Sequence, residues 1–271
     1  MKPILLVDIG NTSMKLGLGD NAGIGDTFCL PTKDMYTADS LGFHLTTLLN
    51  YKNIRPADLG ACLICSVVPG LDPIFRQAGE KFLGLTPLSF PGDFFISLEN
   101  RYAHPEEVGA DRLLAAFAAR TLYPDPTCLI AVDFGTATTF DCVHDNAYLG
   151  GLICPGVLSS HMALAMNAAK LPRISLEIDE AEPLIGRSTA TSLSHGFIFG
   201  FAAMSQGLCA MLKEQLPGTV EVVATGGFAQ DVAKVWKNLD HLRPDLILEG
   251  LRLAWLEAQH IKPATRINPA L

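Results

Sequence analysis

The chain of 271 residues carries 20 lysines and arginines against 28 aspartates and glutamates, a net charge of −8 at pH 7. Its hydrophobic residues, 49% of the total, can fill a packed core, so a wholly disordered protein is excluded, and the length suits about two domains. The acidic balance, with no run of lysines and arginines, argues against a nucleic-acid partner.

Short apolar runs alternate along the chain with longer stretches of helical periodicity. The apolar runs predict strands at 3–9, 14–18, 25–30, 61–68, 128–134, 137–144, 147–153 and 219–224. The helical stretches are 37–51, 73–83, 109–122, 158–169, 189–215, 228–238 and 246–260. This alternation predicts an α/β protein in which helices flank mixed sheets. Turn-like residues at 123–126 predict a boundary between two domains, 1–123 and 124–271.

The seven cysteines are odd in number and scattered through apolar surroundings, which is typical of reduced thiols in a cytoplasmic protein. Cys62 and Cys65 form a C-x-x-C pair, but no second pair lies at ligand spacing, so two core residues are favoured over a redox or zinc site. The apolar run at the N-terminus is too short for a signal sequence. We therefore expect a cytoplasmic protein.

The segment between Arg187 and Lys213 contains no charged residue, and Gly196 and Gly200 form a G-x-x-x-G pattern within it. Its length would allow a membrane span, but its many hydroxyl groups and His195 make it too polar for lipid. We expect no membrane partner, and a helix that is buried in the core or at a subunit contact.

One pattern occurs twice, as VDIGNTSMKLGL at 7–18 and VDFGTATTFDCV at 132–143. Each copy has an apolar strand, an Asp, any residue, a Gly, small polar residues and a second strand. The repetition indicates a duplicated half. A single D-x-G is most simply a hairpin turn, but two copies at the ends of buried strands favour a clamp on the phosphates of a nucleotide.

The two turns have the chemistry that such a clamp needs. Gly10 and Gly135 would let the backbone turn sharply and approach a ligand. The residues that follow leave backbone N–H groups free and offer polar side chains to phosphate oxygens: Asn11, Thr12 and Ser13, then Thr136, Ala137, Thr138 and Thr139. Asp8 and Asp133 could hold a metal ion, directly or through water, and Lys15 adds a counter-charge.

A third glycine element, ATGG at 224–227, lies between a predicted strand and a predicted helix. Gly226 and Gly227 would let the backbone pass close to a base or a ribose. The sequence has neither a Walker A nor a Rossmann glycine motif, and its histidines show no H-E-x-x-H spacing, which argues against a zinc enzyme. His161 is expected on the surface, at the start of a helix.

Together these residues resemble the type III pantothenate kinases, within the actin–hexokinase–Hsp70 superfamily of ATP-binding folds. The resemblance runs in order along nearly the whole chain: DIGNTSMK (8–15), CSVVPG (65–70), YAHPEEVGADR (102–112), DFGTATT (133–139), GGLICPG (150–156), LP (171–172), GRSTATSLSHG (186–196) and ATGG (224–227). The GADR and GGLICPG elements, with their spacing, are specific to this family. The resemblance implies a homodimer of two-domain subunits, each domain ribonuclease-H-like. The first phosphate loop belongs to 1–123, and the second, with the adenosine segment, to 124–271.

The resemblance also implies phosphorylation of pantothenate at its 4′-hydroxyl by ATP, the first step of coenzyme A synthesis. Asp111 matches the general base, Asp133 a ligand of a monovalent cation (K⁺ or NH₄⁺) and Asp8 a partner of Mg²⁺. The ATP contacts implied are Asp8, Ile9, Gly10, Asn11, Thr12, Ser13, Met14, Lys15, Gly135, Thr136, Gly226 and Gly227. The pantothenate contacts implied are Tyr102, Gly109, Ala110, Asp111, Arg112 and Thr189.

Simpler interpretations of single residues stay open. Asp111, in the first turn of a predicted helix, is by itself most simply a cap or a partner of the helix dipole. Arg112 is by itself most simply a surface partner of Glu106 or Glu107. Ser188 departs from the family, which more often has Asn before the Thr that matches Thr189.

Two other functions are weighed against a pantothenate kinase. One is a kinase for another small hydroxylated substrate on the same ATPase fold, such as a sugar. The other is a nucleotide-binding regulatory accessory protein, because some relatives of this family are described in that way. The complete set of Asp8, Asp111 and Asp133 favours catalysis over regulation.

Overall fold

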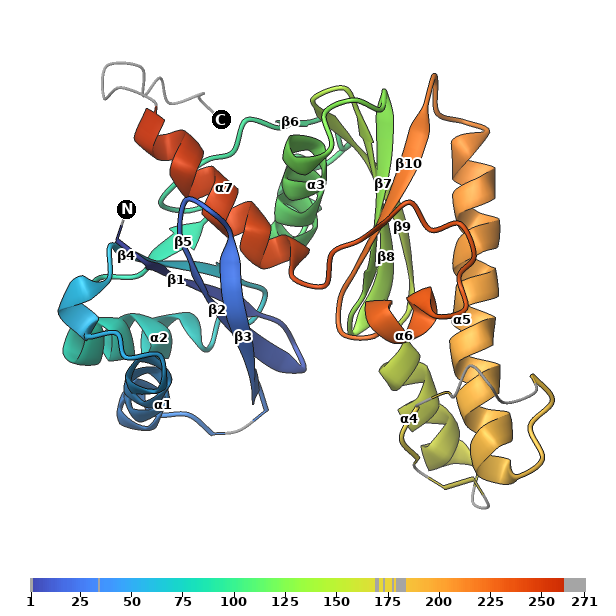
Figure 1. The fold of residues 1–271 in the computed structure, drawn as a ribbon, viewed down its shortest axis with the longest axis horizontal. Helices are drawn as coiled ribbons and strands as arrows, with labels where there is room; N and C mark the ends of the chain where they lie inside the picture. Colours follow the sequence, from blue (N-terminus) through green and yellow to red (C-terminus); the bar gives the residue numbers. More distant parts are fainter. Residues whose placement is uncertain are drawn as a thin grey trace. The chain divides into compact units, whose positions relative to one another are not determined.

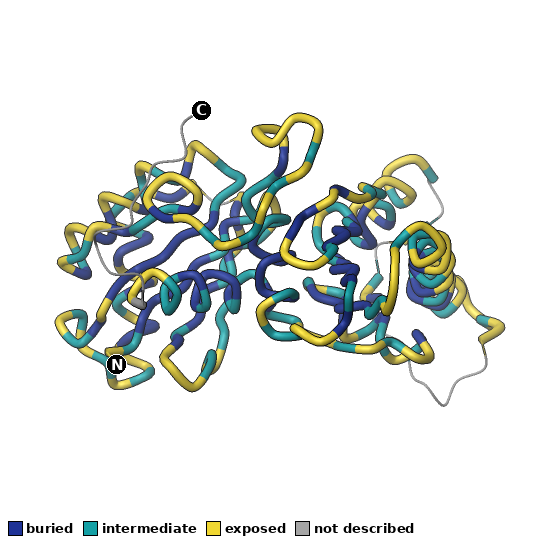
Figure 2. Tube along the Cα trace, turned by 90° about the horizontal axis from the view of Figure 1, so that it is seen from above, coloured by how far each residue is buried: buried dark blue, intermediate teal, exposed yellow. Residues whose placement is uncertain are grey.

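The computed structural model describes residues 2–33, 35–168, 171–172, 174–176, 178 and 184–260, and its chain folds into two compact α/β units (Figure 1). Unit 1 takes its residues from Met1–Ser97, Gly109–Leu114 and Ile247–Leu271. Unit 2 takes its residues from Leu98–Val108 and Ala115–Leu246. In each unit the central strands are buried and the connecting turns are exposed (Figure 2). The predicted α/β fold with helix-flanked mixed sheets is confirmed.

Unit 1 contains a five-stranded sheet in the order β3-β2-β1-β4-β5. Its strands are β1 (Ile4–Ile9), β2 (Ser13–Gly19), β3 (Ile24–Pro31), β4 (Ala61–Ser66) and β5 (Leu88–Phe90). The first three strands pair antiparallel, whereas β4 is parallel to β1 and β5 is parallel to β4.

Helices lie on both faces of this sheet. They are α1 (Ala38–Tyr51), α2 (Asp72–Ala78) with a π-helical turn at Gly79–Leu83, a 3₁₀ turn at Pro56–Asp58, and α7 (Leu246–His260). Because side chains alternate along a strand, Leu5, Val7 and Ile9 pack in one cluster with α1 and α2. Leu6 points to the opposite face, which α7 covers. If Gly19 carried a Cβ atom, that atom would lie 2.9 Å from Leu6 Cδ1 and 3.3 Å from Cδ of the α7 residue Arg252.

Unit 2 contains a six-stranded sheet in the order β11-β10-β7-β8-β9-β6. Its strands are β6 (Glu99–Asn100), β7 (Cys128–Phe134), β8 (Ala137–His144), β9 (Ala147–Pro155), β10 (Val220–Thr225) and β11 (His241–Leu242). Its helices are the larger part of α3 (Ala110–Leu122), then α4 (Val157–Asn167), α5 (Thr189–Lys213), α6 (Ala229–Ala233) and a 3₁₀ turn at Pro105–Glu107. The core forms where β7 packs against α5, with Ile130 and Val132 in one cluster with Ile198.

The two sheets repeat the same topology. The order β3-β2-β1-β4-β5 corresponds strand for strand to β9-β8-β7-β10-β11, with the same parallel and antiparallel pairings. Each D-x-G pattern joins the first two strands of its repeat, β1 to β2 and β7 to β8. This correspondence agrees with the duplication expected from the repeated pattern.

The compact units have different bounds from the two predicted domains, 1–123 and 124–271, because the last helix of each repeat packs largely with the other repeat. Most of α3 belongs to unit 2, where Arg120 donates hydrogen bonds to the carbonyl oxygens of Pro126 (2.8 Å) and Asp145 (3.4 Å). Nearly all of α7 belongs to unit 1, where Arg252 donates to the Asp20 carbonyl at 3.2 Å. Domain bounds defined by the duplication stay a prediction.

Most predicted elements are found within a few residues of their expected ends, with two differences. The helix expected at 228–238 ends at Ala233, and the chain beyond it buries Trp236 against Phe134, with ring centroids 6.3 Å apart. The short strands β5, β6 and β11 were not predicted, because two or three residues carry too little periodicity.

Helix α5 is unusual because it is apolar yet only partly buried within its own unit. Among the described residues it is the one helix that is long and apolar enough to cross a membrane, and 28% of its most apolar window is buried. Ser188 begins the helix with a capping box, in which its hydroxyl accepts from Thr191 N–H at 3.1 Å.

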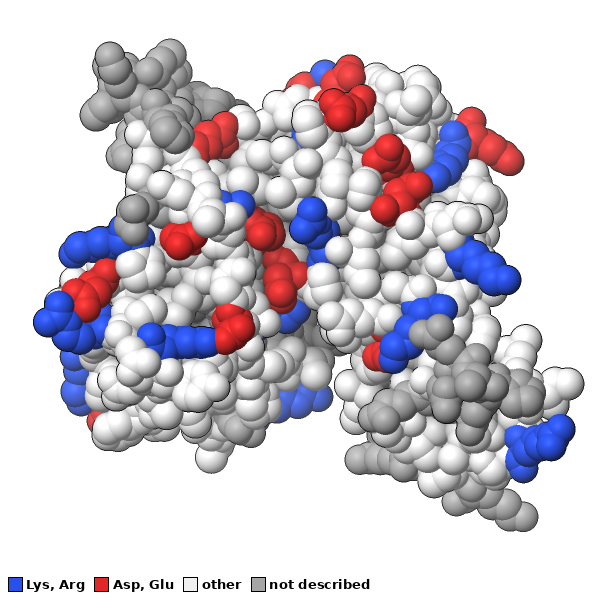
Figure 3. All heavy atoms as spheres, in the orientation of Figure 1, with Lys and Arg blue, Asp and Glu red and all other residues white. Residues whose placement is uncertain are grey.

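On the face of the molecule drawn in Figure 3, basic and acidic side chains are interspersed.

Candidate functional site

The first D-x-G turn joins β1 to β2 in unit 1. Gly10 N–H donates to the Ser13 carbonyl at 3.1 Å, and the Thr32 hydroxyl donates to the Gly10 carbonyl at 2.7 Å. Asn11 and Thr12 are exposed at the tip, so their backbone N–H groups lie at the surface. This is the arrangement expected of a phosphate-binding turn.

The residues on either side of this turn divide into two kinds. Ile9 and Met14 have fully buried side chains, so only their backbone can contact a ligand. Asp8 and Lys15 are half-buried and face each other in the β1–β2 register. Their charges lie beside the turn.

The Cys65 thiol is buried in unit 1, and the charges of three carboxylates act on it. Cys65 is the register partner of Asp8 on the parallel strand β4 and is 0% exposed. Burial raises the pKa of the Cys65 thiol well above its ordinary value, and the negative charges of Asp8, Asp111 and Asp72 raise it further. The charges of Asp8 and Asp111, which are far apart in sequence, therefore both act on Cys65.

Asp111 lies in the first turn of α3, and its Oδ1 accepts a hydrogen bond of 2.8 Å from the Arg112 N–H. A Cβ on Gly109 would lie 2.4 Å from this Oδ1, so any larger residue there would displace the carboxylate. Burial raises the pKa of Asp111, while the N–H and the positive charge of Arg112 lower it to a smaller extent. Asp111 is thus a partly buried carboxylate with an increased affinity for a proton.

Arg112 is half-buried, and its charge acts on Asp111. Glu106, one of the surface partners considered for it, lies 3.9 Å from His104 Nδ1. The positive charge of the guanidinium lowers the pKa of the Asp111 carboxyl group.

The second D-x-G turn joins β7 to β8 in unit 2, and Gly135 N–H donates to the Ala137 carbonyl at 3.0 Å. The ATGG turn packs directly against it. A Cβ on Gly226, whose φ is +94°, would lie 2.1 Å from Asp133 Oδ1 and 2.7 Å from Phe134 N. A Cβ on Gly227 would meet nothing within 4 Å, so open space lies on that side. The resemblance assigned residues of both turns to ATP, but the direct contact between the two turns could not be predicted from the sequence.

The start of α4 completes the support of the second turn. The Ser159 hydroxyl donates to the Thr136 carbonyl at 2.7 Å, and a Cβ on Gly156 would lie 2.2 Å from the same oxygen. Neither residue was predicted as part of the site, although Gly156 ends the GGLICPG element. The conformation of Thr136 is therefore fixed by contacts from α4.

Tyr102 and Thr189 also lie in unit 2. Tyr102 is half-buried, and its N–H donates to Asn100 Oδ1 at 3.0 Å. Thr189 is exposed at the first residue of α5, directly after the capping residue Ser188. Since Ser and Asn both cap helices well, the departure at Ser188 leaves Thr189 at the start of the helix.

A metal ion at either D-x-G turn would need ligands other than protein side chains, such as backbone oxygens, water or phosphate. Among the described residues there is no group of three or more His, Cys, Asp or Glu that could hold a metal ion. Asp8 and Asp133 each offer carboxylate oxygens to a cation. A hard cation bound to one carboxylate, backbone oxygens, water and phosphate fits this chemistry.

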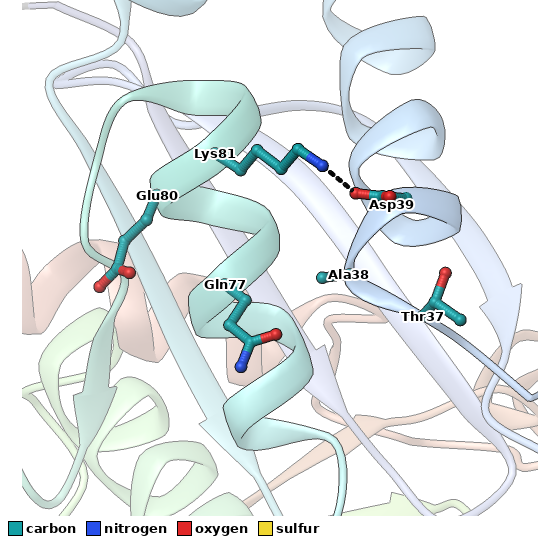
Figure 4. Close-up of a pocket in the computed structure, with 6 residues that line it drawn as sticks. All are labelled: Thr37, Ala38, Asp39, Gln77, Glu80 and Lys81. Atoms are coloured by element: carbon teal, nitrogen blue, oxygen red, sulfur yellow. Dashed lines mark hydrogen bonds and ion pairs between the residues drawn. The ribbon is translucent and has the colours of Figure 1, made fainter.

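A surface pocket of unit 1 lies elsewhere, between the start of α1 and the end of α2 (Figure 4). It is lined by Thr37, Ala38, Asp39, Gln77, Glu80 and Lys81. Lys81 Nζ and Asp39 Oδ1 form an ion pair of 2.6 Å at its edge. None of the predicted site residues lines it, so this pocket is not the candidate site.

The structure differs from the sequence analysis in one predicted position and in two residues that were not predicted. The surface position predicted for His161 is wrong: its side chain is 3% exposed and packs against Phe197, with ring centroids 5.3 Å apart, because α4 lies against α5. Cys65 and Asp72 were not predicted beside the candidate residues. The parallel register of β1 and β4 could have indicated Cys65, whereas Asp72 reaches this place only through the fold.

Comparison with known proteins gives a consistent result. A family model described as type III pantothenate kinase matches residues 4–211. A type III pantothenate kinase of Nitratidesulfovibrio vulgaris is 59% identical over 253 residues, covering 93% of this chain and 97% of that protein.

Solved structures share the fold at lower identity. A ROK family glucokinase from Streptomyces griseus, in complex with glucose and AMPPNP, has a TM-score of 0.52 at 14% identity, covering 94% of this chain and 99% of its own. Component A of the (R)-2-hydroxyglutaryl-CoA dehydratase of Acidaminococcus fermentans has a TM-score of 0.53 at 14% identity, covering 96% and 100%. These two similarities concern the fold alone.

Proposed function

The chain belongs to the type III pantothenate kinase family, and from that membership together with its two turns we propose that it transfers the γ-phosphoryl group of ATP to the 4′-hydroxyl of pantothenate. The observation that carries this assignment is Asp111. It is a carboxylate at a helix start, with its pKa raised by burial and with Arg112 beside it.

In the reaction, the 4′-oxygen of pantothenate bonds to the γ-phosphorus while the bond from that phosphorus to the β,γ-bridging oxygen breaks, and ADP leaves. Asp111 accepts the hydroxyl proton. A carboxylate is a sufficient base because phosphoryl transfer passes through a loose transition state, in which positioning and charge stabilisation do most of the catalysis. The raised pKa improves the match between this base and neutral pH.

The phosphates of ATP are bound by the two turns. Backbone N–H groups from Asp8 to Lys15 act in the first turn, and Gly135 and Thr136 act in the second. Gly226 and Gly227 lie against the second turn, where the open space beside Gly227 suits the adenosine. Lys15 supplies positive charge next to the first turn.

Two cations fit the same residues. Asp8 would hold Mg²⁺, directly or through water, and Asp133, whose carboxylate packs against the backbone of Gly226, would hold K⁺ or NH₄⁺. When bound, these ions neutralise the charge of the phosphates. Pantothenate is contacted by Tyr102, Gly109, Ala110, Asp111, Arg112 and Thr189, with Arg112 as the partner of its carboxylate.

The test is mass spectrometry of the products formed from pantothenate by the purified protein with Mg·ATP and K⁺. We expect 4′-phosphopantothenate and ADP in equal amounts. A panel of sugars and other small alcohols serves as the control for acceptor choice. Binding of ATP without any phosphopantothenate would contradict the assignment and favour a regulatory role or another acceptor.

The enzyme acts as a homodimer in this proposal, and α5 forms part of the contact. A stripe of small residues is exposed along this helix: Ser192, Gly196, Gly200, Ala203, Gly207 and Ala210. A Cβ on Gly196, Gly200 or Gly207 would meet nothing within 4 Å, so the backbone of a partner could approach closely there. An apolar helix that its own chain covers so little is typical of a subunit contact.

Gly200→Leu is expected to convert the dimer to a monomer in sedimentation velocity. Leucine favours a helix more than glycine does, by about 1 kcal/mol, so loss of the dimer would not reflect loss of the helix. Circular dichroism of the variant provides the control. A wild-type monomer, or a Gly200→Leu variant that remains dimeric, would exclude this contact.

The cellular setting follows from the same residues. All seven cysteines are free thiols, as in proteins of a reducing compartment. We assign the enzyme to the cytoplasm, with ATP and pantothenate as its partners and without a role for nucleic acid or a membrane.

A further inference from the structure

Unit 2 contains a buried carboxylate that none of the roles above uses. Asp141 on β8 is 1% exposed. Its Oδ1 accepts a hydrogen bond of 2.9 Å from the Tyr148 hydroxyl, and its Oδ2 accepts one of 3.1 Å from the Thr139 hydroxyl. Tyr148, on β9, is fully buried. Because a buried carboxylate is costly unless its oxygens are hydrogen-bonded, this arrangement tolerates little movement of Tyr148.

The ring of Tyr148 packs against the ring of Tyr102. Their centroids lie 6.2 Å apart with 44° between the ring planes. The Tyr102 ring also lies over the backbone of β9 at Gly150, where a Cβ would be 3.0 Å from both Cδ2 and Cε2 of the ring. Gly150 has a φ of +110°, so the backbone there both requires a glycine and leaves room for the ring.

The backbone before Tyr102 is paired and hydrogen-bonded with Tyr148. Asn100 is the β6 partner of Tyr148 in the parallel β6–β9 register, and Arg101 N–H donates to the Tyr148 carbonyl at 2.9 Å. The Asn100 side chain also stabilises the loop that follows it: its Oδ1 accepts from Tyr102 N–H at 3.0 Å, and its Nδ2 donates to the Pro105 carbonyl at 3.2 Å. Tyr148 therefore orients Tyr102 through both its ring and its backbone.

We propose that Tyr148, fixed by Asp141, is a positioning residue that orients Tyr102 for binding pantothenate. This inference rests on the proposed function, in which Tyr102 contacts that substrate. Tyr102 is half-buried: part of its ring lies against Tyr148 and Gly150, and the exposed part is available to a ligand. A binding residue must be held within about 0.5 Å of its productive place, and the hydrogen bond to Asp141 prevents the Tyr148 ring from shifting beneath it.

The test is Tyr148→Phe, which removes one hydroxyl and keeps the ring. We expect the KM for pantothenate to rise about tenfold, equivalent to about 1.4 kcal/mol, with the KM for ATP changed less than about twofold. The same substitution in a Tyr102→Ala background should have no further effect on the pantothenate KM, because it acts through Tyr102. A purely structural role would affect both substrates, or both backgrounds, alike.

Tyr123→Phe is the matched control, since the Tyr123 hydroxyl accepts a bond of 2.6 Å from Arg243 Nε elsewhere in unit 2. It should leave both KM values unchanged. If Tyr148→Phe is too unstable to assay, the double variant with Asp141→Asn removes the buried charge that has lost the Tyr148 hydroxyl, and it has the same expected result.

The outcomes separate the inference from the function on which it rests. If the wild type forms no phosphopantothenate, both are overturned. If the wild type is active but Tyr148→Phe leaves the pantothenate KM unchanged, raises both KM values together, or acts equally in the Tyr102→Ala background, the positioning role is wrong and the kinase assignment stands.

Discussion

Asp111→Asn is expected to lower kcat about 10²–10⁴-fold, the usual contribution of a general base, and at neutral pH to raise the Tm. The carboxamide has nearly the same shape but cannot accept the proton of the 4′-hydroxyl. The hydrogen bond from the Arg112 N–H can be kept, because the carboxamide oxygen also accepts.

The gain in stability follows from the direction of the pKa shift. Burial raises the pKa of Asp111 above the ordinary value of 3.8, and this outweighs the effects of Arg112 that lower it. A carboxyl group whose pKa is raised by folding contributes stability below its unfolded pKa and loses that contribution as the pH rises through the folded pKa. The ionised carboxylate therefore costs stability at neutral pH, and the Asn variant avoids this cost.

Two measurements check this prediction. The kcat/KM of the wild type should fall on the acid side with a midpoint above the ordinary Asp value, since the base must be ionised. The difference in Tm between the variant and the wild type should shrink as the pH falls below the raised pKa. Asp58→Asn is the control: the hydrogen bond from Arg55 lowers the pKa of Asp58, so its replacement should not raise the Tm. A loss of kcat below about tenfold would contradict the role of Asp111 as the base.

Gly226→Ala is expected to abolish most activity and the stimulation by K⁺. The added methyl group would lie 2.1 Å from Asp133 Oδ1 and 2.7 Å from Phe134 N, and glycine's φ of +94° is unfavourable for alanine. Both the carboxylate and the second turn must move, so the carboxylate that would hold the cation is displaced. We expect kcat to fall at least about 10²-fold, as for loss of a preorganised charge-stabilising group.

The measurement compares rates in K⁺ and in tetramethylammonium, a cation too large for the same site, for the wild type and the variant. Gly227→Ala is the control for folding, because its methyl group would meet nothing within 4 Å. We expect Gly226→Ala to have a lower Tm than Gly227→Ala. A Gly226→Ala enzyme that is still stimulated by K⁺ at a near-normal rate would show that the cation does not bind beside Asp133.

The features predicted best from the sequence are those with a strong local pattern. Buried strands such as β1 and β7 read as unbroken apolar runs, and the repeated D-x-G marks the turn at the end of each. What could not be predicted depends on contacts between distant segments. Gly226 against Asp133, and Asp111 beside Cys65, are set by strand order and helix packing, which leave no periodic signal.

Single residues show the same limit. Met14, within the first phosphate loop, has a fully buried side chain, so membership of a motif does not show which atoms are available. His161 lies at the start of a helix, yet is buried because α5 packs over α4, through a contact with Phe197, 36 positions further along the chain (197 − 161). A helical pattern shows that a face is apolar but not which neighbour covers it.

The packing of α7 has a consequence for synthesis on the ribosome. The strands of unit 1 are synthesised before unit 2, but α7, which lies against β2 through Leu248 and Arg252, is synthesised after it. The sheet face that carries Leu6 therefore stays without this helix until unit 2 has been made. The nascent chain must keep that apolar surface from aggregating while the whole of unit 2 is synthesised.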